Sequence, residues 1–310
     1  GEIVAMYGGP DYVTEPLNNV TQAVAQAGST FKVYGLLAAM ESGVSFDHIL
    51  PGKSGTEIAG YTVNNYGGEN FKDLTLLQAT IHSVNTAYVQ LAYELGISNV
   101  IEGAFRSGLP RETLGVEENL TFVLGSASPR VIDVAESYAT FAANGIHATP
   151  YLVDRVTLPN GGLFYEAEAE SENVFDANVI AGVNYALEQV VNYGTGMNAR
   201  VAGSSIAGKT GTTDENKSAW FAGYSNSLTA VVMLTKQDAN GNPISLNGTG
   251  GLGSVTGGSF PARIFAAFMK AALLQFPSTP FVEPTQTPSI SPTPTDSPTS
   301  SLSPSATASP

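Results

Sequence analysis

The sequence contains no cysteine, only three histidines and an unusually small share of charged residues, 13%. Without cysteine the chain can form no disulfide, no thiolate nucleophile and no cysteine-ligated zinc site. His48, His82 and His147 lie far apart along the chain, and no two of them are spaced four residues apart. We therefore expect no metal site, and no part of the sequence calls for a cofactor.

Positive charge is also scarce, because 13 lysines and arginines stand against 27 aspartates and glutamates and leave a net charge of −14. Such a chain cannot assemble the basic patch that nucleic acids or anionic lipid surfaces require, so we expect no nucleic-acid partner. No apolar run reaches the roughly 20 residues that a membrane helix needs, and no signal peptide is recognisable. The opening GEIVAMYGG is typical of a strand already in progress, and we expect the chain to be a fragment.

Strand signals lie near both ends of residues 1–276, and helix signals fill the middle. This order predicts an α+β fold in which distant segments form one antiparallel sheet, helices cover the sheet and a helical subdomain is inserted. Strands are predicted at 3–7, in a hairpin at 151–165 and twice within 219–235, and helices at 29–42, 74–95, 131–143, 176–192 and 260–276. Residues 277–310 are almost entirely Ser, Thr, Pro and Ala. We expect them to form a disordered tail, either passive or a spacer outside the cell.

The first chemical signal is Ser29-Thr30-Phe31-Lys32, an S-x-x-K pattern at the start of a predicted helix. Positions i and i+3 share one face of a helix, so the Lys32 amine can reach the Ser29 hydroxyl and act as its base. The free N–H groups of the first helical turn favour a developing oxyanion. By composition such a pattern is expected about once in 300 residues, so a helix cap at Ser29 and a solvated Lys32 explain it equally well.

The second signal is Ser83-Val84-Asn85, although S-x-N also occurs at 171–173 and 245–247. Only Ser83 and Asn85 lie in a long segment with helical apolar spacing, where polar side chains need a reason to be buried. That reason is either a role in a site or polar packing between helices.

The third signal, Lys209-Thr210-Gly211-Thr212, is the most specific, because four fixed residues are expected by chance in under ~1% of chains of this length. Its small side chains let an extended ligand lie along the strand. The Lys209 amine and the hydroxyls of Thr210 and Thr212 can hold a carboxylate. The backbone N–H of Thr212 can complete an oxyanion hole.

Residues 203–210 also fit the phosphate-loop pattern G-x-x-x-x-G-K-T. That loop requires a strand before it and a helix after it, so that a helix N-terminus faces the phosphates. Here two predicted strands follow, which disfavours a nucleotide site.

The order S-x-x-K, S-x-N, K-T-G is the motif set of penicillin-binding proteins and serine β-lactamases. Longer stretches around the motifs resemble the transpeptidase domain of class A, bifunctional penicillin-binding proteins: GEIVAMYGGPDY, AGSTFKVYGLLAAMESG, LTLLQATIHSVNTAYVQLAYELG, VIDVAESYATFAANGIHATPYLV and AGKTGTTDENKSAWFAGY. The resemblance covers nearly all of 1–276. It departs at Ser218, where such sequences often have aspartate, and at Ser225-Asn226, which replaces a common Thr-Pro.

For the fold, the resemblance implies an antiparallel five-stranded sheet sandwiched by helices, with an inserted all-helical subdomain. For the chemistry, it implies that Ser29 attacks the penultimate D-alanine carbonyl of a peptidoglycan stem peptide, with Lys32 as its base. Ser83, helped by Lys209, then carries the proton to the leaving amine. The residues that it implies for substrate binding are Asn85, Thr210, Gly211 and Thr212.

The resemblance further implies that the amine of a second stem peptide takes the acyl group and that β-lactams acylate Ser29 in place of the donor. It also implies a location outside the cytoplasmic membrane, an upstream glycosyltransferase domain with a membrane anchor, and contact with the cell-wall synthesis machinery. Two alternatives stay open: a D,D-carboxypeptidase or serine β-lactamase, and a non-catalytic β-lactam-binding sensor.

Overall fold

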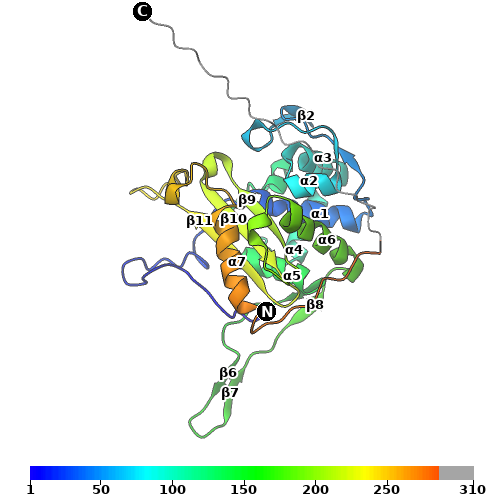
Figure 1. Ribbon diagram of the computed structural model, residues 1–310. Helices are drawn as coiled ribbons and strands as arrows, with labels where there is room; N and C mark the ends of the chain where they lie inside the picture. The colour runs from blue at the N-terminus through cyan, green and yellow to red at the C-terminus, as the bar shows by residue number, and fades with distance from the viewer. Residues whose placement is uncertain (286–310) are drawn as a thin grey trace, which may run out of the picture.

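The computed structural model describes residues 1–285, so most of the predicted tail, from 286 onward, lies outside the described residues. Helices and strands alternate along the chain, and the strands that form the central sheet come late (Figure 1). The helices are α1 Lys32–Glu41, α2 Leu76–His82, α3 Asn85–Leu95, α4 Ile97–Arg106, α5 Val131–Ala142, α6 Ala177–Tyr193 and α7 Phe260–Ala272, with a 3-10 turn η1 at Gly28–Phe31. The strands are β1 Ile49–Leu50, β2 Thr56–Ile58, β3 Tyr61–Val63, β4 Leu74–Thr75, β5 Ile146–Ala148, β6 Arg155–Thr157, β7 Leu163–Glu166, β8 Ser171–Asn173, β9 Ala207–Thr212, β10 Ser218–Tyr224 and β11 Thr229–Thr235.

The central sheet is antiparallel and has the order β11-β10-β9. Every residue of its middle strand β10 is buried, because helices cover both faces. Phe221 points to one face and packs against Phe265 of α7, at 4.8 Å between ring centroids. Tyr224 points to the other face and packs against Tyr138 of α5, at 6.3 Å. This alternation confirms the predicted α+β layering of helices on an antiparallel sheet.

The sheet within residues 1–285 has three strands where the resemblance implies five. The predicted strand at 3–7 does not form, and its neighbourhood is reduced to a single bridge between Glu2 and Tyr151. Two backbone hydrogen bonds hold this bridge, from the Ile3 N–H to the Tyr151 carbonyl at 2.9 Å and from the Tyr151 N–H to the Gly1 carbonyl at 3.0 Å. The predicted hairpin within 151–165 does form, as β6 and β7, and it projects from the body (Figure 1).

The predicted helix over 74–95 is broken into α2 and α3. Helix α2 begins with a capping box between Thr75 and Gln78 and ends at His82. Ser83 then adopts a left-handed conformation, with φ 58° and ψ 42°, and Val84 is extended. A non-glycine residue in this region is strained, and such strain is concentrated at functional sites.

Helix α1 runs through the centre of the molecule and packs on α3, α4 and α6. Its residues 32–39 are all buried, which explains why it is apolar around nearly its whole circumference. Because Lys32 opens this helix, its amine lies in the interior of the protein.

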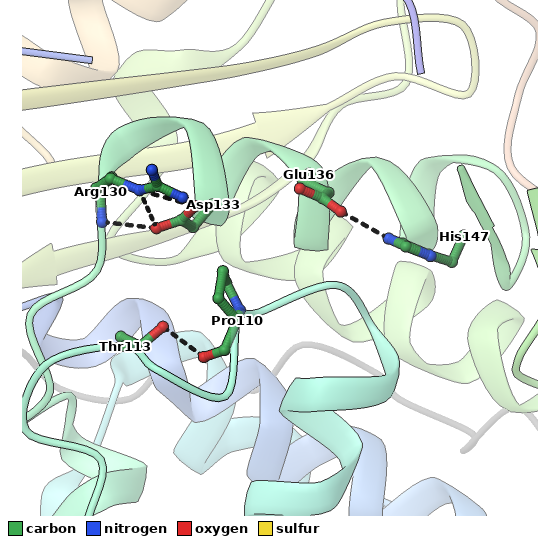
Figure 2. Close-up of polar contacts among 6 residues, drawn as sticks. All are labelled: Pro110, Thr113, Arg130, Asp133, Glu136 and His147. Atoms are coloured by element: carbon green, nitrogen blue, oxygen red, sulfur yellow. Dashed lines mark hydrogen bonds and ion pairs between the residues drawn. The ribbon is translucent and has the colours of Figure 1, made fainter. Parts of the chain in front are cut away.

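Helix α5 contacts η1, the turn before α1, through a hydrogen bond. Its first turn is closed by Arg130 and Asp133, with Nη2 to Oδ1 at 2.6 Å, and Glu136 contacts His147 at 2.8 Å (Figure 2). Burial raises the pKa of the Glu136 carboxyl. Further along α5, the buried Tyr138 hydroxyl donates to the carbonyl of Thr30 in η1 at 2.8 Å. The position of Ser29 is thus fixed from the α5 side as well.

The described part of the C-terminal segment, 277–285, lies against the body. Phe281 packs edge-on against Tyr224 at 5.7 Å, and the Thr285 N–H donates to Asn178 of α6 at 3.3 Å. The boundary between domain and tail at 276 stays a prediction. None of the helices in residues 1–285 combines the length and the hydropathy that crossing a bilayer would take.

Candidate active site

Ser29 lies in η1, directly before α1, as the sequence predicts. Gly28 there has φ +54°, and a Cβ on it would lie 2.9 Å from the backbone nitrogen of Thr212. The start of α1 therefore packs directly on β9. The Lys32 Nζ lies 3.0 Å from the Ser29 Oγ, which is the contact that the i, i+3 spacing predicts.

The Lys32 amine has three further oxygen neighbours. It lies 2.7 Å from Asn85 Oδ1, 2.5 Å from the Ser83 carbonyl oxygen and 3.2 Å from the Ser83 Oγ. The Asn85 and Ser83 carbonyl oxygens can only accept, so they take the two N–H groups of a neutral amine. The lone pair of that amine is then left for the Ser29 hydroxyl, which donates to it.

Ser83 stands between two lysines because of the break that ends α2. Its Oγ lies 3.2 Å from the Lys32 Nζ and accepts from the Lys209 Nζ at 2.8 Å. In a continuous helix the Ser83 side chain would follow the helical path of its neighbours. The left-handed backbone conformation of Ser83 directs the hydroxyl to the two lysines instead. The strain at Ser83 thus gives a hydroxyl that bridges both amines.

Both amines are fully buried, and burial penalises their charged forms. Burial, together with the nearby Lys209, lowers the pKa of Lys32 well below its ordinary value of 10.5. Burial lowers the pKa of Lys209 to about 7. None of the ion pairs within residues 1–285 includes either lysine, so no carboxylate offsets this effect.

The amide of Asn85 is held on its other side by the loop before α2. Its Nδ2 donates to the Asn64 carbonyl at 2.9 Å, and its backbone N–H donates to Asn65 Oδ1 at 3.0 Å. Asn65 is buried and also accepts from the Thr86 N–H at 3.1 Å. Asn65 lies outside the three motifs, so the motifs alone do not predict its contact with Asn85.

The K-T-G-T segment is strand β9, and it forms one wall of the site. A Cβ on Gly211 would lie 2.4 Å from the Ala27 carbonyl, so Gly211 serves the close approach of β9 to η1. The hydroxyl of Thr210 pairs with that of Thr195 at 2.7 Å, and the Thr212 hydroxyl accepts from the Gly257 N–H at 3.1 Å. Thr195 is a second residue that the motif analysis missed.

The geometry contradicts a phosphate loop and shows no metal centre. Lys209 lies inside β9, and the chain continues into β10 rather than into a long helix. Across residues 1–285, no group of three His, Cys, Asp or Glu side chains is arranged to hold a metal ion. The structure instead brings together the three motif segments around two buried amines.

The lowered pKa of Lys32 predicts how acylation depends on pH. An amine acts as a base only when unprotonated, so the rate of Ser29 acylation falls as pH drops through the pKa of Lys32. Because that pKa lies well below 10.5, we expect the rate to level off at a clearly lower pH than it would with an ordinary lysine. Stopped-flow acylation of Ser29 by a reactive acyl donor between pH 5 and 10 measures this profile. A rate that still rises tenfold per pH unit at pH 9–10 would show an ordinary lysine.

A half-buried serine beside a buried lysine, packed against an antiparallel sheet, is the arrangement of active-serine acyltransferases. The family model for the penicillin-binding protein transpeptidase domain matches residues 1–269. The chain therefore belongs to the penicillin-binding protein transpeptidase family.

Individual relatives agree with this assignment. Penicillin-binding protein 1A of Mycobacterium tuberculosis is 30% identical over 92% of this chain and 36% of its own length. The protein of that name from Rickettsia prowazekii is 28% identical, over 92% of this chain and 38% of its own length. The chain thus spans a little over a third of the length of these relatives.

Solved structures give the same result. The PonA1 protein of Mycobacterium tuberculosis in complex with penicillin V is 31% identical, has a TM-score of 0.80, and covers 90% of this chain and 77% of its own. An imipenem acyl-enzyme complex of penicillin-binding protein A from the same organism is 26% identical, has a TM-score of 0.69, and covers 83% of this chain and 62% of its own.

Proposed function

We propose that this chain is a serine D,D-transpeptidase that crosslinks peptidoglycan stem peptides. The observation that carries the proposal is the Lys32 amine, which is buried without a carboxylate partner in residues 1–285 and lies 3.0 Å from the Ser29 Oγ. Burial lowers the pKa of this amine and so favours its neutral form, and the acceptors around it leave its lone pair for the serine proton. Such a pair activates a hydroxyl that is otherwise a weak nucleophile.

In the first half-reaction the Ser29 Oγ bonds to the penultimate D-alanine carbonyl carbon, and its proton passes to Lys32. The Ser83 hydroxyl lies 3.2 Å from Lys32 and 2.8 Å from Lys209, so it can pass a proton to the leaving nitrogen. The peptide C–N bond breaks, and D-alanine leaves. In the second half-reaction an acceptor amine attacks the ester carbon and Ser29 regains its proton.

The proposed substrate contacts are those that the family resemblance implies, and the positions of these residues are compatible with them. The donor peptide lies along β9, the amide of Asn85 binds its backbone, and the hydroxyls of Thr210 and Thr212 hold its terminal carboxylate. The N–H groups of Ser29 and Thr212 form the oxyanion hole. Gly211 contributes by letting β9 approach η1, where a Cβ would lie 2.4 Å from the Ala27 carbonyl.

Hydrolysis of the acyl-enzyme requires a base that activates water, and Lys32, 3.0 Å from the Ser29 Oγ, can serve water as well as an acceptor amine. A carboxylate that would serve water specifically is what the described residues lack. Within residues 1–285, no aspartate or glutamate forms a hydrogen bond with Ser29, Lys32, Ser83 or Lys209. We also propose that the domain works outside the cytoplasmic membrane, with a glycosyltransferase domain and a membrane anchor upstream.

The test is the fate of the acyl group. We expect a peptide ending in D-Ala-D-Ala to release D-alanine and, when a D-amino acid is added as acceptor, to yield the amide product. Mass spectrometry measures both products. D-alanine release without amide product would show a carboxypeptidase, and a penicillin adduct lost within seconds would show a β-lactamase. If neither reaction occurs, the domain is a binding module.

A further inference from the structure

Thr195 lies in the turn after α6, where three segments of the site meet. Its N–H donates to the Ile81 carbonyl at 3.3 Å, two residues before Ser83. A Cβ on Gly258 would lie 2.5 Å from the Thr195 carbonyl, so the segment before α7 packs on it too. These backbone contacts fix Thr195 without using its side chain.

The side chain of Thr195 contacts β9 instead. Its hydroxyl oxygen lies 2.7 Å from that of Thr210, and either group can donate. Thr195 is exposed, whereas Thr210 is only 6% exposed. The hydrogen bond therefore links a solvent-exposed side chain, Thr195, to a nearly buried one, Thr210.

The protons of the two β9 hydroxyls can be assigned for the case of a bound anion. The Thr212 hydroxyl already accepts from the Gly257 N–H and donates to no protein group within residues 1–285, so its proton is free. A carboxylate only accepts, so it draws the Thr210 proton as well. The Thr195 hydroxyl must then donate to the Thr210 Oγ1, which orients and polarises it.

We propose that Thr195 is a positioning residue for recognition of the substrate carboxylate, acting through the hydroxyl of Thr210. The inference rests on the proposed function and adds a residue outside the three motifs. Its consequence is specific: loss of the Thr195 hydroxyl weakens the response to a carboxylate and leaves the attack of Ser29 on a carbonyl unchanged.

The experiment compares acylation by a penicillin with acylation by its methyl ester, which cannot present a carboxylate. Wild type is expected to prefer the acid. Thr195→Val keeps the shape of the side chain and removes the hydroxyl, and we expect it to lower the acid-to-ester ratio of kinact/KI about fivefold. The rate with the ester should stay within twofold of the wild-type rate.

Two variants control for structural damage. Thr195→Ser retains the hydroxyl and should restore the wild-type ratio, and Thr195→Ala should match Thr195→Val. An unchanged ratio, or an equal loss of both rates, overturns the role of Thr195. The wild-type reactions test the proposed function separately. If wild type forms a covalent adduct with neither the penicillin nor its methyl ester, the proposed function and this inference are both overturned.

Discussion

Ser29→Ala is expected to abolish covalent labelling by a fluorescent penicillin, and no excess of reagent should restore it. The reason is chemical: the variant lacks the oxygen that forms the ester. Ser29 is only half-buried and its Oγ forms one hydrogen bond in the described structure, to Lys32, so the fold should persist. Gel fluorescence measures the label, and an unchanged melting temperature confirms folding. A labelled Ser29→Ala protein would show that another residue is the nucleophile.

Lys32→Met should behave differently from Ser29→Ala, because it keeps the nucleophile and removes only its base. General-base catalysis contributes about 10²- to 10⁴-fold, so we expect acylation to slow by about 10³-fold and the adduct still to accumulate over hours. Methionine fills a similar length of side chain in the buried start of α1. Wild-type acylation rates in Lys32→Met would assign the base to Lys209 instead.

Gly211→Ala is expected to lower the free energy of unfolding by about 2–3 kcal/mol, a typical cost of overpacking a well-packed interior. The added Cβ would lie 2.4 Å from the Ala27 carbonyl and 2.8 Å from the Thr30 Cγ2. The first contact is with backbone, so β9 and η1 must separate. Because η1 carries Ser29 and β9 carries Lys209, acylation should slow about tenfold or more.

Urea unfolding and acylation kinetics of Gly211→Ala test both effects. Gly253→Ala is the matched control, since no atom lies within 4 Å of a Cβ at that position. Its stability and its acylation rate should equal those of wild type within error. If Gly211→Ala also equals wild type, the contact between β9 and η1 is looser than the structure shows.

Local sequence signals predicted much of the fold. The helix predicted at 176–192 forms as α6, and the Asp176 Oδ1 caps its start by accepting from the Asn178 N–H at 2.8 Å. The two strands predicted within 219–235 form as β10 and β11 and pair with each other. These features depend on caps and turns, whose chemistry is contained within a few residues.

The features that the sequence did not predict arise from distant contacts. Apolar periodicity runs through Ser83, so it predicts one helix where the structure has two. The hydrogen bonds of Ser83 to Lys32 and Lys209 stabilise the break, and these residues are far away in the sequence. Thr195 and Asn65 were missed for the same reason, because each forms a hydrogen bond with a motif residue 15 or 20 positions away in the sequence. The roles of the motif residues themselves stay predictions until the substitutions are made.

The burial of Lys32 also determines when the chain becomes reactive. Its amine is enclosed only when segments around residues 29, 83 and 209 have met, and in an unfolded chain its pKa returns to about 10.4. A lysine that is protonated at neutral pH cannot activate Ser29. Reactivity toward acyl donors is therefore expected to be a property of the finished fold, and a chain that has not finished folding should present an inert serine to them.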